Sequence, residues 1–113
     1  ARITGVDTSP EMLEAARKEL PDATWVQADL ATWQPAAPPD LVFTNATLHW
    51  LGDHTRLLPR LLGLLAPGGV LALEIGDGEA DATSELFTQC GFVDVQKTRD
   101  LGRIERVVSG IAP

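Results

Sequence analysis

Strand-like runs that each end in one polar side chain do most to limit how this chain can fold. Three such runs are residues 2–6 ending at Asp7, residues 24–28 ending at Asp29, and residues 41–44 ending at Asn45. The run at 41–44 holds no charged residue, which is typical of a strand covered on both faces. The pattern indicates parallel strands that share one polar edge.

Helical patterns separate or follow these runs. The predicted helices are residues 10–20, 54–65 and 81–89. Thr8 or Ser9 can cap the first helix, with Pro10 in its first turn. Pro59 should kink the second helix or move its regular start, and Gly91 should end the third.

The remaining runs complete the plan of the fold. Residues 70–75 read as a fourth strand, and residues 92–96 and 105–109 as a terminal antiparallel hairpin. This order predicts an α/β fold with a three-layer, doubly wound and mostly parallel sheet. Residues 1–113 are expected to form a single domain.

The predicted core consists of apolar side chains on these strands and on the second helix. It comprises Val6, Trp25, Val26, Leu41, Val42, Phe43, Leu61, Leu65, Val70, Leu71 and Leu73.

Charge and composition limit the classes of partner that the chain could bind. Nine Lys and Arg stand against sixteen Asp and Glu, a net charge of −7, which disfavours nucleic acid and anionic membranes as partners. No apolar run reaches the roughly 18 residues of a membrane span, so a cytoplasmic protein is expected. His49, Asp53 and His54 lie close in sequence, but no further ligand is placed beside them, and no metal site is predicted.

The strand-end side chains suggest a ligand. Asp7 could accept both hydroxyl groups of a ribose, Asp29 could accept from an adenine amino group, and Asn45 can both donate and accept. Ligands of parallel sheets bind beyond the carboxyl ends of the strands, which favours a nucleotide-like molecule here. The alternative reading is that these residues only form turns and helix caps.

Four segments carry a resemblance to a known family. They are residues 5–12, 28–35, 45–50 and 65–72. With them, residues 3–72 resemble the trans-aconitate methyltransferases, which are class I S-adenosylmethionine-dependent enzymes. The resemblance implies a Rossmann-like methyltransferase fold and methylation of a small carboxylic acid, the small-molecule substrate.

The resemblance also implies roles for individual residues. Asp7 would bind the cofactor ribose, Asp29 would lie near the adenine, and Asn45 near the methionine part. Thr8, Met12 and Leu30 complete the implied cofactor-binding set. His49 and Trp50 would border the acceptor pocket, although from the residues alone they read as half-buried packing side chains. No catalytic acid or base is assigned.

The last part of the chain resembles another family. Residues 73–113 are similar to the tail of the release-factor glutamine methyltransferases, so the chain reads as a chimera of 1–72 and 73–113. That family's Asn-Pro-Pro-Tyr motif is here Asn45-Ala46-Thr47-Leu48. Its glutamine activity is therefore not carried over.

The first strand of the methyltransferase fold, with its glycine-rich cofactor turn, would precede Ala1. Without it, weak or absent S-adenosylmethionine binding is expected, and the strands ending at Asp7 and Asn45 should pair directly. The Gly76 and Gly78 turn is a candidate substitute for the cofactor turn. The alternative to a methyltransferase is a catalytically inactive α/β scaffold without a cofactor. Whether the chain is an enzyme, and its oligomeric state, stay open.

Overall fold

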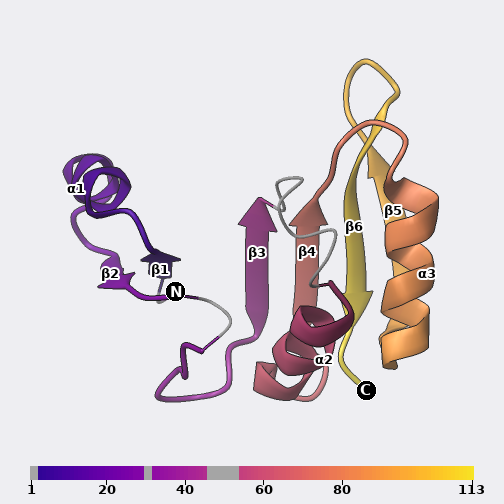
Figure 1. The fold of residues 1–113 in the computed structure, drawn as a ribbon, viewed down its shortest axis with the longest axis horizontal. Helices are drawn as coiled ribbons and strands as arrows, with labels where there is room; N and C mark the ends of the chain where they lie inside the picture. The colour runs from indigo at the N-terminus through magenta and orange to yellow at the C-terminus, as the bar shows by residue number, and fades with distance from the viewer. Residues whose placement is uncertain (1–2, 30–31, 46–53) are drawn as a thin grey trace. The chain divides into compact units, whose positions relative to one another are not determined.

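The computed structural model describes residues 3–29, 32–45 and 54–113. The chain divides into two compact units, residues 1–34 and residues 35–113 (Figure 1). The elements are β1 (Thr4–Asp7), α1 (Pro10–Glu19), β2 (Thr24–Gln27), β3 (Leu41–Asn45), α2 (His54–Leu64), β4 (Val70–Glu74), α3 (Ala80–Cys90), β5 (Val93–Arg99) and β6 (Glu105–Ile111). Their order and type confirm the α/β class, and the single domain over residues 1–113 stays a prediction.

The first unit is a small β-α-β unit. β1 and β2 pair in parallel, from Thr4 opposite Thr24 to Asp7 opposite Gln27. Ser9 is the residue that caps α1, since its hydroxyl accepts the Met12 N–H at 3.3 Å. Leu13 is the buried residue of α1, with 2% of its surface exposed.

The second unit holds a four-stranded sheet in the order β3-β4-β6-β5. β3 and β4 are parallel, whereas β6 is antiparallel to both of its neighbours. The last strand is thus inserted between β4 and β5, which confirms the predicted terminal hairpin. Pro59 lies inside α2, which nevertheless begins at His54, so the proline does not delay the helix.

The predicted pairing of the Asp7 strand with the Asn45 strand would join the two units, and it stays a prediction. β1 pairs with β2 in a two-stranded sheet, and β3 pairs with β4 in another. An uncharged apolar pattern indicates that a strand is covered, but it does not specify which strand lies beside it. The choice of neighbour depends on contacts between distant parts of the chain.

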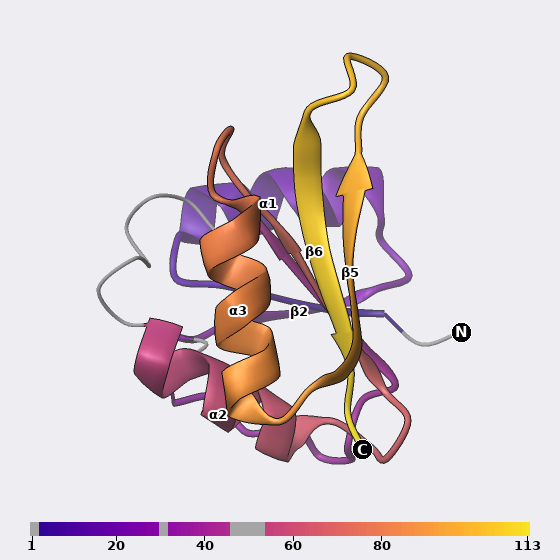
Figure 2. The ribbon, with the colours of Figure 1, turned by 90° about the vertical axis from the view of Figure 1, so that its right-hand side faces the viewer.

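The core of the second unit lies between its sheet and the helices α2 and α3, which cover one face of the sheet (Figure 2). Its fully buried side chains include Leu58, Leu61, Leu71, Leu73, Phe87 and Val108. The rings of Phe87 and Phe92 pack 4.9 Å apart. Gly110 makes room for them, because a Cβ atom there would lie 2.9 Å from Phe87 Cδ2.

Two core predictions fail on β3. Leu41 and Phe43 are 61% and 58% exposed, although both were expected inside. In the β3–β4 register they lie opposite Val70 and Ala72, while Val42 lies opposite the buried Leu71. Side chains alternate along a strand, so Leu41 and Phe43 lie on the face away from α2 and α3.

The other core predictions divide into two groups. The buried ones are Leu61, Leu65, Leu71 and Leu73. The half-buried ones are Val6, Trp25, Val26, Val42 and Val70.

Candidate functional site

Asp7 lies at the carboxyl end of β1 and is half-buried. Its Oδ1 accepts the backbone N–H of Ser9 at 2.8 Å, which holds the turn into α1. Its backbone carbonyl accepts the Ala28 N–H at 3.0 Å, so the chain leaving β2 stays beside the end of β1. The predicted shared polar edge is therefore present in the first unit.

The contact to Ser9 bears on what Asp7 can do. It is the turn-forming role that the alternative reading proposed, and it occupies one lone pair of Oδ1. An ionised carboxylate has about four acceptor sites on its two oxygens. Turn formation is therefore compatible with further hydrogen bonds from a ligand's hydroxyl groups.

Other residues of the predicted cofactor set lie around the same strand ends. Asp29 is exposed, and its backbone carbonyl accepts the N–H groups of Thr32 and Trp33 at 3.0 and 2.9 Å. Met12, in the first turn of α1, is 62% exposed. Thr8 follows Asp7 directly, and Leu30 lies outside the described residues.

Gln27 is a neighbour of this group that the sequence reasoning missed. Its side-chain amide donates to the Thr8 carbonyl at 3.4 Å and links the end of β2 to the loop after β1. At the end of the short strand Thr-Trp-Val-Gln, Gln27 looks like an ordinary exposed strand residue. Its position opposite Asp7 could have been found only from the register.

A second group of strand ends lies in the second unit. Asn45 ends β3 opposite Glu74, the last residue of β4. The side chain of Asn45 is not among the described ones, and His49 and Trp50 lie outside the described residues. The implied acceptor pocket is therefore not described.

The Gly76 and Gly78 turn joins β4 to α3. Gly78 has a positive φ of 83°, a conformation that favours glycine. A Cβ atom on Gly76 would lie 2.9 Å from Glu79 Oε1, so a carboxylate occupies the space beside this glycine. Asp77 adds a second acidic residue, and the turn is poorly suited to the carboxylate end of an amino acid-like ligand.

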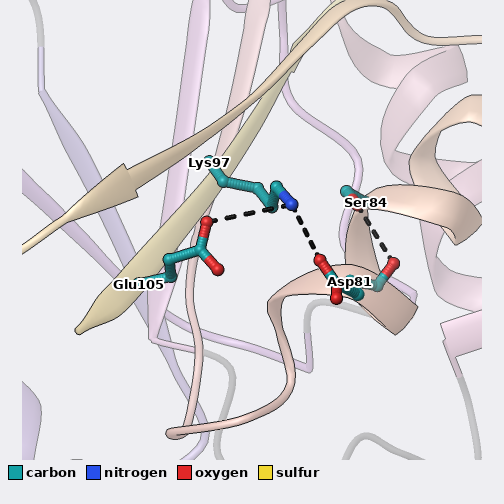
Figure 3. Close-up of polar contacts among 4 residues, drawn as sticks. All are labelled: Asp81, Ser84, Lys97 and Glu105. Atoms are coloured by element: carbon teal, nitrogen blue, oxygen red, sulfur yellow. Dashed lines mark hydrogen bonds and ion pairs between the residues drawn. The ribbon is translucent and has the colours of Figure 1, made fainter.

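Lys97 forms a polar cluster that the sequence did not single out (Figure 3). Its Nζ lies 2.7 Å from Asp81 Oδ1, in the first turn of α3, and 3.9 Å from Glu105 Oε2 on β6. The hydrogen bond and charge of Lys97 lower the pKa of Asp81, and those of Asp81, with Glu105, raise the pKa of Lys97. The cluster joins the start of α3 to the terminal hairpin.

The described residues hold neither a metal-binding cluster nor a membrane-spanning helix. In the parts of the chain that the structure describes, no three His, Cys, Asp or Glu side chains come together in a way that could hold a metal ion. Within the same residues, no helix has the length and apolar character needed to cross a membrane.

Comparison with known proteins shows the family to which the chain belongs. A family model described as a methyltransferase domain matches residues 1–73. Trans-aconitate 2-methyltransferase of Methylobacterium radiotolerans is 56% identical over 87 residues, which are 77% of this chain and 34% of that protein. The enzyme of Escherichia coli O1:K1 is 46% identical over 103 residues, 91% of this chain and 40% of that protein.

The chain thus spans between a third and two fifths of the length of these relatives. Because the E. coli alignment covers 103 residues, it extends past residue 73 into the part for which the sequence predicted a second family. The chimera stays a prediction.

Among solved structures, the N-methyltransferase NodS of Bradyrhizobium japonicum, in complex with S-adenosyl-L-homocysteine, superimposes with a TM-score of 0.75. It is 19% identical, and the match covers 99% of this chain and 67% of that one. At this identity the likeness shows the fold alone. It confirms the predicted Rossmann-like methyltransferase fold.

Proposed function

The chain belongs to the methyltransferase domain family, and we propose from this premise that it is part of an S-adenosylmethionine-dependent methyltransferase that acts on a small carboxylic acid. The residues proposed to bind the cofactor are Asp7, Thr8, Met12, Asp29, Leu30 and Asn45. His49 and Trp50 are proposed to border the acceptor.

The position of Asp7 carries this proposal. Its carboxylate ends a parallel strand, precedes a helix and is half-buried, while lone pairs remain on it beside the one that accepts from Ser9. Ligands of open parallel sheets bind at such strand ends. Two ribose hydroxyl groups are donors that a carboxylate in this position fits.

The acceptor class rests on the relatives. The two trans-aconitate methyltransferases described above are 56% and 46% identical to the chain over the matched parts. Trans-aconitate, or a similar small polyacid, is therefore the acceptor that we propose. As the relatives are much longer, the activity of a complete enzyme includes residues beyond those compared.

The proposed mechanism relies on alignment. S-adenosylmethionine would supply a methyl group on a sulfonium, which needs little acid–base assistance to leave. Asp7 and Asp29 would hold the nucleoside end and so fix where the rest of the cofactor lies. Positioning alone can supply a large part of the acceleration, on the order of 7–11 kcal/mol in well-oriented systems.

Isothermal titration calorimetry with S-adenosyl-L-homocysteine tests the proposal. Asp7→Ala should weaken binding roughly tenfold to a hundredfold, because a carboxylate that accepts from hydroxyl groups contributes about 1.5–3 kcal/mol. Asp22→Ala is the matched control, an exposed aspartate at the opposite end of β2, and should bind like the unaltered chain. Equal affinity of the Asp7 variant and the control would place the ribose site elsewhere.

The same titration addresses the inactive scaffold. If the folded, unaltered chain takes up no ligand even at millimolar concentration, the scaffold reading is correct for this chain. Micromolar binding that is lost in Gly76→Val would instead assign the cofactor turn to residues 76–78.

A further inference from the structure

The turn between β5 and β6 lies at the edge of the sheet where ligands of such folds bind. β3 and β4 run parallel, and β5 runs in the same direction as β4, because β6 is antiparallel to both of its neighbours. The turn at residues 100–104 follows the end of β5, so it lies at the carboxyl edge of this sheet (Figure 1). Ligands of parallel sheets bind beyond this edge.

The hairpin also extends past the strands beside it. Val107 lies opposite Glu74, the last residue of β4, and β6 continues beyond that point to Glu105. At about 3.3 Å per residue, the turn lies roughly 10 Å beyond the end of β4. A small ligand over the ends of β3 and β4 would therefore have the turn at its side.

Asp100 holds this turn in one conformation. Its Oδ1 accepts the Ile104 N–H at 3.0 Å, and its Oδ2 accepts from Arg106 Nε at 3.3 Å. Its backbone N–H donates to the Ile104 carbonyl at 2.9 Å, and its carbonyl accepts the Arg103 N–H at 3.0 Å. Arg103 has a φ of 65°, which is uncommon for a residue other than glycine. The turn thus holds an exposed arginine at a fixed backbone position.

The hairpin carries four basic residues, and two of them lack an ion-pair partner. Lys97 and Arg106 each pair with carboxylates of neighbouring elements. Arg99 and Arg103 are exposed, and neither forms an ion pair with any residue that the structure describes. Their guanidinium groups are therefore available to a ligand at this edge.

The proposed acceptor needs such cations. The same edge carries Glu74, Asp77 and Glu79, and the whole chain has a net charge of −7. Such a surface repels a polyanion unless cations lie beside its binding position. The planar guanidinium group of arginine fits a carboxylate with two parallel hydrogen bonds.

We propose that Arg99 and Arg103 bind the carboxylates of the acceptor that are not methylated, and so determine its preference for a polyacid. The proposal rests on the proposed function, in which one carboxylate of a small polyacid receives the methyl group. A polyacid then has at least one other carboxylate that can reach the hairpin, whereas a monoacid has none.

A titration with trans-aconitate, followed by the amide resonances of the labelled chain in NMR spectra, tests the proposal. The amides of residues 99–104 should shift in the unaltered chain, and the shifts should weaken at high salt. Arg103→Gln and Arg99→Gln should each weaken binding about fivefold, the upper end for an exposed ion pair. Crotonate, an unsaturated monoacid, should bind the unaltered chain and these variants alike.

The matched control is Arg17→Gln, which removes the same charge from an exposed position in the last turn of α1. That turn leads to the start of β2, away from the carboxyl ends of the strands, so the variant should bind trans-aconitate like the unaltered chain. Equal weakening in all three variants would overturn the proposal, because it would show an effect of net charge alone. The absence of shifts at residues 99–104 at millimolar trans-aconitate would also overturn it.

S-adenosyl-L-homocysteine separates this proposal from the proposed cofactor site. Arg103→Gln should keep the affinity of the unaltered chain for this ligand, and Asp7→Ala should keep the shifts that trans-aconitate causes at the hairpin. Shifts at the hairpin in a chain that takes up no S-adenosyl-L-homocysteine would support the arginines and refute the cofactor site. Uptake of S-adenosyl-L-homocysteine without shifts at the hairpin would do the reverse.

Discussion

The two units differ in what they contain. Thirteen apolar side chains are buried among the described residues. Leu13 is the one that lies in residues 1–34, and the other twelve lie in residues 35–113. The described side chains that we propose to bind the cofactor, among them Asp7 and Asp29, all lie in the first unit. The part proposed to bind the ligand therefore has little core of its own.

This difference in buried apolar surface bears on the stability of each unit. Segments with few buried apolar contacts open at lower free energy than a well-packed core, and ligand-binding segments are commonly drawn from such regions. We expect the first unit to open before the second, and binding of a cofactor to raise its stability through mass action.

The largest effect should come from the core of the second unit. Phe87 is 0% exposed and packs on Phe92, so Phe87→Ala should lower the free energy of unfolding by about 3–5 kcal/mol. Chemical denaturation followed by circular dichroism measures it. The control is Phe43→Ala, whose ring is 58% exposed and whose loss should cost much less. Similar losses in the two variants would mean that β3 is as buried as its sequence suggested.

A smaller effect is expected in the first unit. Leu13→Ala should cost about 2 kcal/mol, the lower end for a buried leucine, because α1 packs on two short strands, β1 and β2. Amide hydrogen exchange should show faster exchange in residues 3–29 and unchanged rates in β4 and β6. Faster exchange throughout the chain would show that the two units unfold together.

The smallest effect concerns the exposed pair of Lys97 and Asp81. The pKa of Asp81 is lowered, so its contribution is present above the ordinary value of 3.8 and is lost as pH falls through the lowered folded value. The pKa of Lys97 is raised, so its contribution is present below 10.5 and is lost as pH rises through the raised folded value.

Lys97→Met should therefore shift the denaturation midpoint most near neutral pH and hardly at all in strong acid. The shift should shrink at high salt, because exposed ion pairs are screened. Arg99→Met is the control, a neighbouring cation on the same strand. A shift that persists unchanged in strong acid would mean that the aliphatic part of Lys97, and not its charge, supports α3.

The elements of the fold could be predicted because their signals are local. The apolar runs, the cap at Ser9 and the glycine at the end of α3 all act within a few residues. The neighbour of each strand could not be predicted, since nothing in residues 41–45 specifies which strand lies beside them. The exposure of Leu41 and Phe43 could not be predicted either, since no local pattern specifies that they lie on the sheet face away from α2 and α3.

The candidate site was predictable to a similar extent. The position of Asp7 at a strand end follows from its sequence context, and the structure confirms it. The contact between Gln27 and Thr8 needs the parallel register, which no local pattern encodes. The cluster of Lys97, Asp81 and Glu105 joins three elements and was missed for the same reason.

Gly110 has a consequence for how this chain could be altered by evolution or in the laboratory. The aromatic pair of Phe87 and Phe92 occupies the space where any larger residue at position 110 would place its first carbon, with Phe92 Cβ also at 2.9 Å. A substitution there would require both a smaller side chain at 87 and a shift of the backbone that carries Phe92. Substitutions at position 110 should therefore survive a mutational library only together with changes at both 87 and 92, so that these three positions would vary as a single unit.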